Sequence, residues 1–123
     1  MTKYITINTE GYTKLYEPNQ DYDFKEIQKL VEGYFTHLRY IEIDTFDDKM
    51  KSIDNILKRD KRGIKIYCCE DAIPRGMDIN PYVKHHWGTN DERQTTFGTV
   101  LIQVSKKLSE KCSEDIEILK SSD

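Results

Sequence analysis

A thiol, a carboxylate and an imidazole lie close together in the second half of this chain, at Cys69, Glu70 and His85. A nucleophilic active site needs these three groups, because a base activates the thiol and an acid orients the base. Adjacent carboxylates at Glu70 and Asp71 could also share acid and base work. Only closeness in the sequence connects these residues, so we assign no catalytic residue and keep a small hydrolase or transferase as an alternative.

The same part of the chain raises the question of a metal site, since thiolates and imidazoles are zinc ligands. Cys68 and Cys69 are neighbours in an expected strand, so their side chains would point to opposite faces. The chain has no C-x-x-C or H-x-x-x-H pair that would place two ligands side by side. We therefore expect neither a metal site nor a cofactor.

The segment after Glu70 suits ligand binding better than catalysis, because it mixes aromatic rings, cations and hydrogen-bonding groups. In such a set Tyr82 or Trp87 would stack on a base, and Arg75 or Arg93 would meet a phosphate. The simpler alternative is that the rings close the core edge, the arginines are solvated, and Asn80 forms a turn. The predicted ligand-binding residues are Arg75, Asn80, Tyr82, His85, Trp87 and Arg93.

The first half of the chain predicts a hairpin, a helix and a strand. Residues 3–8 and 12–16 flank a Glu10-Gly11 turn, which favours a β-hairpin. Asp23 can cap a helix over residues 23–33, and Gly33 is placed to end it. Its apolar positions recur with helical spacing at Phe24, Ile27, Leu30 and Val31. Residues 37–43 alternate as a strand should.

The second half predicts an inserted helix and two more strands. Residues 45–62 carry apolar side chains at helical spacing, and residues 64–69 and 97–104 are rich in β-branched residues. Residues 82–87 would form one helical turn or an irregular loop, and residues 88–96 a mobile polar loop. The tail after residue 105 has a weak apolar stripe, which predicts a frayed helix rather than a docked one.

These elements fit one domain, as expected for 123 residues. We predict an α+β fold with an antiparallel or mixed sheet of about five strands packed on one main helix. The domain would span residues 1–105, with residues 45–62 as a helical insertion and 106–123 as a polar C-terminal tail. An exposed hairpin edge at residues 3–8 would favour a homodimer or a higher homo-oligomer.

The net charge is −3, with 19 basic residues interspersed among 22 acidic ones. This balance lacks the basic surface expected of a duplex-binding protein, so nucleic acid is not an expected partner. No apolar run is long enough to span a bilayer, and the N-terminus lacks signal-peptide features, so no membrane partner is expected. Three cysteines suit a reducing compartment, and we expect a cytoplasmic protein, in the host cytoplasm if viral.

Short motifs connect the chain to a known group. A helix-ending pattern of leucine or isoleucine, glutamine, leucine, valine, two glycines and tyrosine is matched by Ile27, Gln28, Leu30, Val31, Gly33 and Tyr34. Glu32 replaces the first glycine of the pair. Later matches are Cys69-Glu70-Asp71, Asp78-Ile79-Asn80 with Tyr82, and Gly98-Thr99-Val100-Leu101.

In these motifs the chain resembles a family of small domains of unknown function from bacteriophages, bacterial mobile elements and large DNA viruses. The resemblance covers residues 4–104, with residues 45–62 as an insertion. Cys69 departs from the usual asparagine, and the turn glycine near Glu70 is absent. The resemblance implies a compact α+β domain without an established catalytic apparatus.

We therefore expect a non-catalytic accessory protein of viral or mobile-element type. Its expected role is to bind and sequester a host component, first of all a small nucleotide-like signal. An alternative is a protein antagonist that occupies a host enzyme through a sheet edge or the helix around Met50.

Overall fold

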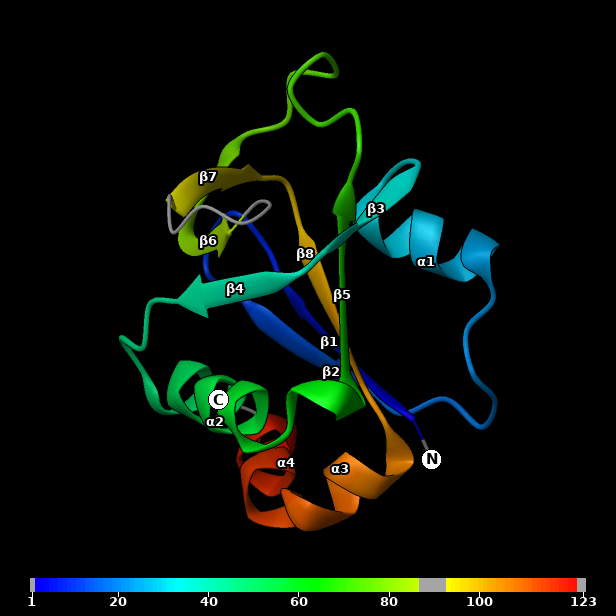
Figure 1. The fold of residues 1–123 in the computed structure, drawn as a ribbon, viewed down its shortest axis with the longest axis vertical. Coiled ribbons are helices and arrows are strands. Elements are labelled where there is room, and N and C mark those ends of the chain that lie inside the picture. The colour runs from blue at the N-terminus through cyan, green and yellow to red at the C-terminus, as the bar shows by residue number, and fades with distance from the viewer. Residues whose placement is uncertain (1, 87–92, 122–123) are drawn as a thin grey trace.

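The computed structural model describes residues 2–86 and 93–121, whose strands form two antiparallel sheets. The larger sheet has the strand order β2-β1-β8-β5-β3 and the smaller one β4-β6-β7 (Figure 1). The strands are β1 (Lys3–Ile7), β2 (Thr13–Tyr16), β3 (Phe35–Leu38), β4 (Tyr40–Ile43), β5 (Ile64–Cys69), β6 (Ile79–His86), β7 (Arg93–Phe97) and β8 (Val100–Val104). With the helices these sheets form a single α+β domain, which confirms the predicted fold class.

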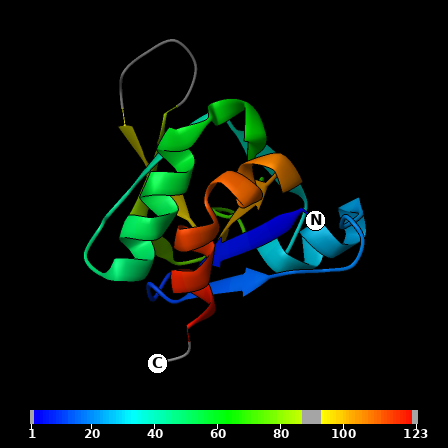
Figure 2. The same cartoon turned by 90° about the horizontal axis from the view of Figure 1, so that it is seen from below.

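The helices cover the two faces of the five-stranded sheet unequally (Figures 1 and 2). They are α1 (Phe24–Val31), α2 (Asp48–Arg59), the 3₁₀ helix η1 (Lys61–Gly63), α3 (Lys106–Lys111) and α4 (Ser113–Lys120). Helix α1 packs on one face in a small apolar cluster with Tyr4, Tyr67 and Leu101. The main apolar cluster lies on the other face, where the sheet meets α2, α3, α4 and the three-stranded sheet. The five-stranded sheet is thus the middle layer.

Helix α1 begins as predicted and ends differently. The Asp23 carboxylate accepts a hydrogen bond from the Glu26 backbone N–H at 2.9 Å, which caps the first turn. Of the apolar positions at helical spacing, Ile27 and Val31 are buried, whereas Phe24 is 58% exposed. The helix ends at Val31, and the C-cap residue Glu32 takes the left-handed conformation with φ of 64°. Glu32 stands where the family pattern has a glycine, the residue that adopts this conformation without strain.

Two expected strands are each divided between the two sheets. Residues 37–43 break at the exposed Arg39, so that β3 joins the larger sheet and β4 the smaller one. Residues 97–104 break at Gly98, whose φ of 78° ends β7 before β8 starts. Leu38 and Ile41 nevertheless belong to the same buried cluster. At Arg39 and at Gly98 the chain therefore passes directly from one sheet to the other, without an intervening helix.

The expectation of a helical turn or loop at residues 82–86 is wrong, because these residues belong to β6. Strand β6 pairs with β4 on one side and β7 on the other, with an irregularity between Asn80 and Lys84. Of the predicted mobile loop, residues 93–96 form β7, while residues 88–92 lie outside the described part of the chain.

The C-terminal helices are docked, so the predicted frayed tail is wrong. Leu108, Cys112, Ile116 and Leu119 are buried in the main core cluster. Ser105 caps α3 by accepting a hydrogen bond from the Leu108 backbone N–H at 3.2 Å. The apolar stripe is sparse in the sequence, but it is enough for docking because α3 and α4 bend back toward α2 (Figure 2). The apolar side chains of the three helices join one buried cluster.

The prediction of an exposed hairpin edge at residues 3–8 is also wrong. Strand β1 is paired on both sides, with β2 and with β8, and offers no free edge for dimerisation. In the described residues no helix has the length and apolarity needed to cross a membrane.

Candidate functional site

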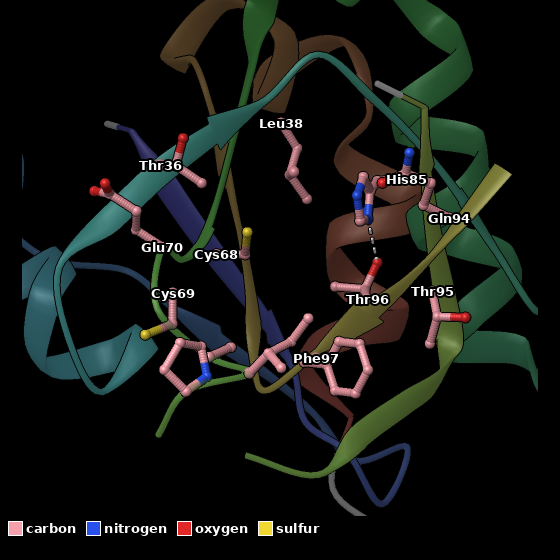
Figure 3. Close-up of a pocket in the computed structure, with 13 residues that line it drawn as sticks. Thr36, Leu38, Cys68, Cys69, Glu70, His85, Gln94, Thr95, Thr96 and Phe97 are labelled. Atoms are coloured by element: carbon pink, nitrogen blue, oxygen red, sulfur yellow. Dashed lines mark hydrogen bonds between the residues drawn. The ribbon is translucent and has the colours of Figure 1, made fainter. Parts of the chain in front are cut away.

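A cavity of about 340 Å³ opens between the two sheets, where β3 and β5 face β6 and β7 (Figure 3). This volume is at the small end of the range for ligand pockets. Small side chains at Thr36, Cys68, Ala72 and Thr96 leave the space open where the sheets diverge. The remaining lining residues are Leu38, Cys69, Glu70, Ile73, Pro74, His85, Gln94, Thr95 and Phe97.

His85 is the central polar group of this cavity. Its Nδ1 lies 2.9 Å from Oγ1 of Thr96, which is itself buried (Figure 3). Burial lowers the pKa of the imidazole below its usual value, and the neighbouring His86 adds to this, while a hydrogen bond with Gln94 acts in the opposite direction. The ring is therefore neutral at pH 7, with one donor and one acceptor nitrogen, of which Nδ1 is engaged with Thr96.

The pKa of His85 is lower in the folded protein than in the unfolded chain. The unfolded chain therefore binds a proton at His85 more readily than the folded protein does. Its contribution to stability is complete above the unfolded pKa near 6.5, and is lost as the pH falls through the folded value. We expect His85→Gln to reduce the fall in stability between pH 7.5 and pH 5. Urea denaturation of both proteins at the two pH values measures this, and an unchanged pH dependence in the variant would contradict it.

The two cysteines at the cavity have different environments. Cys68 lies at its back, and burial raises the pKa of the thiol to about 11. The Cys69 sulfur is turned away from His85, and its thiol donates a hydrogen bond to Oδ1 of Asp71 at 3.1 Å (Figure 3). Both thiols stay protonated at neutral pH, since burial also raises the pKa of Cys69. The structure does not assemble the Cys69, His85 and Glu70 arrangement that a nucleophilic mechanism requires.

The predicted binding residues whose side chains the structure describes do not converge on one site. His85 lines the cavity, whereas Asn80 is buried outside the cavity lining and donates to the backbone carbonyls of Ile7 and Gly98. The Tyr82 ring packs over Gly11, where an added Cβ would lie 2.9 Å from the ring, and beside Phe46. Both residues therefore support the fold.

The predicted cations lie elsewhere or are not described. Arg75 is exposed, with its guanidinium 3.9 Å from Asp71 and in the space beside Gly33. Arg93 is in β7 opposite His86, but its side chain lies outside the described part, as does all of Trp87. The prediction that these side chains act together stays untested.

Sequence reasoning missed Thr36, Leu38 and Phe97 as cavity residues, although Leu38 and Phe97 lie in predicted strands and Thr36 directly precedes one. The available signal was Gly98, which directly follows Phe97 and lies where the chain passes from β7 to β8. Glycine in the interior of a strand often marks such a bend.

Within residues 2–86 and 93–121 no three histidine, cysteine, aspartate or glutamate side chains gather in a way that could hold a metal ion. The family resemblance of the short motifs stays a prediction. No protein-family model, no curated protein and no solved structure matches this chain.

Proposed function

We propose that this protein binds a small planar ligand, of nucleobase size and polarity, in the cavity between its two sheets. The observation that carries the proposal is the composition of the cavity wall. Apolar surface from Leu38, Cys68 and Phe97 is combined with neutral hydrogen-bonding groups at His85 and Thr36. Ligand pockets commonly pair an apolar lining with a few placed polar groups.

The charges around the cavity favour a ligand whose inserted part is uncharged. Its described lining contains no lysine or arginine, and Glu70 contributes a carboxylate at its edge. Among the described lining residues a phosphate would meet no cation, and it would be repelled by that carboxylate. The nucleotide-like ligand expected from the sequence is therefore narrowed to its base or nucleoside part.

Binding without turnover is the better supported role. The Cys68 thiol is held protonated by its raised pKa, and the Cys69 thiol faces Asp71 rather than His85. A weak nucleophile and a base already hydrogen-bonded to Thr96 suit retention of a ligand more than chemistry on it. Sequestration of a small host signal by a viral or mobile-element accessory protein agrees with this arrangement.

A thermal-shift screen tests the proposal, with adenosine, guanosine, cytidine, uridine and their monophosphates as probes. A probe at about 100 times its Kd stabilises the folded state by about 2.7 kcal/mol, which raises the melting temperature of a chain this long by about 10 °C. We expect nucleosides to raise it at least as much as their monophosphates, and the bound compound to be recovered intact.

The matched variants are Thr36→Tyr and His37→Tyr, at adjacent positions on opposite faces of β3. Thr36→Tyr places a ring in the cavity and should abolish the shift, whereas His37→Tyr should keep it. The proposal is wrong if no probe stabilises the wild type, or if Thr36→Tyr responds like the wild type. Chemical conversion of the probe would point to the enzyme alternative instead.

A further inference from the structure

The fold gathers positive charge at one end of the molecule from two separate segments of the chain. Residues 58–65 and 106–111 hold eight of the 19 basic residues and only two of the 22 acidic ones. Pairing of Ile64 in β5 with Val104 in β8 brings these two segments together. They form the end of the domain where η1 meets α3 (Figure 1). The rest of the chain is correspondingly acidic.

A cleft of about 330 Å³ lies at this end, and the close approach of two backbones fixes its wall. The Ser105 backbone N–H donates to the Gly63 carbonyl at 2.9 Å. A Cβ at Gly63 would lie only 2.9 Å from both Cβ of Leu108 and Oγ of Ser105, so glycine permits this contact. The cleft is lined by Asp60, Arg62, Gly63, Ser105, Lys107, Leu108 and Lys111.

The cations of this cleft exceed the available carboxylates. Asp60 accepts hydrogen bonds from the backbone N–H of Arg62 at 3.0 Å and from its Nε at 3.2 Å. These bonds, together with the nearby charges of Arg62 and Lys111, hold the pKa of Asp60 below its usual value, so it stays ionised. Among the described residues no carboxylate forms an ion pair with Lys107 or Lys111.

We propose that this cleft binds a compact anion that carries two or more linked phosphates. Arginine offers a planar fork of donors to phosphate oxygens, and lysines add mobile point charges. Arg62 is free to reorient, since its side chain is 92% exposed and its exposed pair with Asp60 is weak. Together Arg62, Lys107 and Lys111 can approach one anion from η1 and from α3.

The rest of the charge distribution selects a compact ligand over an extended one. Outside the two segments the chain holds 20 acidic residues against 11 basic ones, which would repel the flanks of a long nucleic acid. A short oligophosphate can neutralise the cleft without meeting that acidic surface. The cleft shares no lining residue with the cavity between the sheets, so this proposal does not depend on the proposed function.

Isothermal titration calorimetry with inorganic tripolyphosphate, pyrophosphate and orthophosphate tests this site with probes that contain no base. We expect one saturable site, tightest for tripolyphosphate, whose affinity falls as salt is added. Lys107→Gln with Lys111→Gln should weaken binding at least tenfold. The control, Lys25→Gln with Lys29→Gln, removes the same charge from exposed positions on α1 and should change the affinity less than about twofold.

Circular dichroism checks that both double variants keep the fold, and Arg62→Gln provides an independent variant that should also weaken binding. Absence of saturable heat with tripolyphosphate would overturn the proposal. Equal losses in the cleft and control variants would also overturn it, because the effect would then be one of net charge alone. Tighter, cleft-dependent binding of a single-stranded oligonucleotide would assign the surface to nucleic acid instead.

Discussion

Replacement of Asn80 by alanine should lower the free energy of unfolding by about 2 to 5 kcal/mol, because it leaves several buried polar groups without partners. Asn80 is 1% exposed, and its amide nitrogen donates to the carbonyls of Ile7 at 3.1 Å and Gly98 at 3.0 Å. Its side-chain oxygen accepts from the backbone N–H of Tyr82 at 3.2 Å. One side chain therefore ties together the end of β1, the crossing before β8 and the start of β6.

Urea denaturation measures this effect, and Asn55→Ala is the matched control. Asn55 is exposed on α2, and its amide donates to Asp115 at 3.3 Å, so its loss should cost less than about 1 kcal/mol. If Asn80→Ala lowered the free energy of unfolding by less than about 1 kcal/mol, the hydrogen bonds of Asn80 would contribute little to stability. A normal fold with full stability would then restore Asn80 as a candidate ligand residue.

Ile116→Ala should destabilise the protein by about 2 to 5 kcal/mol, as expected for a large-to-small change in a packed core. Ile116 is 3% exposed on α4 and belongs to the main apolar cluster with Leu108 and Leu119. The loss removes apolar contact and leaves a cavity between the C-terminal helices and α2. Its effect directly tests whether the C-terminal segment is docked.

Ile118, on the same helix and 40% exposed, provides the control. The change of Ile118 to alanine should cost less than about 1 kcal/mol, since much of its surface already contacts water. Denaturant midpoints at constant m-value compare the two variants. Similar small losses for both would indicate that residues 106–120 do not form part of the core, as the sequence alone suggested.

The elements that could be predicted from the sequence are those with local signals. The Asp23 and Asp47 side chains cap α1 and α2 by accepting hydrogen bonds from the backbone N–H groups three residues later in the chain. Apolar residues also recur at helical spacing in both helices. The hairpin of β1 and β2 follows from a turn in which Gly11 has φ of 87°. In these segments nearby residues determine the conformation.

The errors occurred where tertiary packing decides. The stripe of α4 is too sparse to specify docking by itself, and only burial against α2 shows its role. Alternation continues across Arg39, so nothing local indicates that β3 and β4 belong to different sheets. The sequence of β6 has no clear hydrophobic period. The segment forms a strand because it pairs with β4 on one side and with β7 on the other.

The candidate site was only partly predictable for the same reason. His85 could be selected by its residue type, but its cavity partners Thr36 and Phe97 come from different sheets. Asn80 and Tyr82 looked like ligand groups because polarity and aromaticity serve ligands and backbones alike. Only the hydrogen bonds of Asn80 and the contact of Tyr82 with Gly11 separate the two roles.

The most direct test of the central claim is an amide NMR titration of the ¹⁵N-labelled protein with the nucleoside that gives the largest thermal shift. If the nucleoside binds in the cavity between the sheets, the chemical-shift changes should saturate and be largest at Thr36, Cys68 and Thr96. The amide signals of α3 should not change. Largest changes around Arg75 or α3, or no saturable change at any described residue, would contradict it.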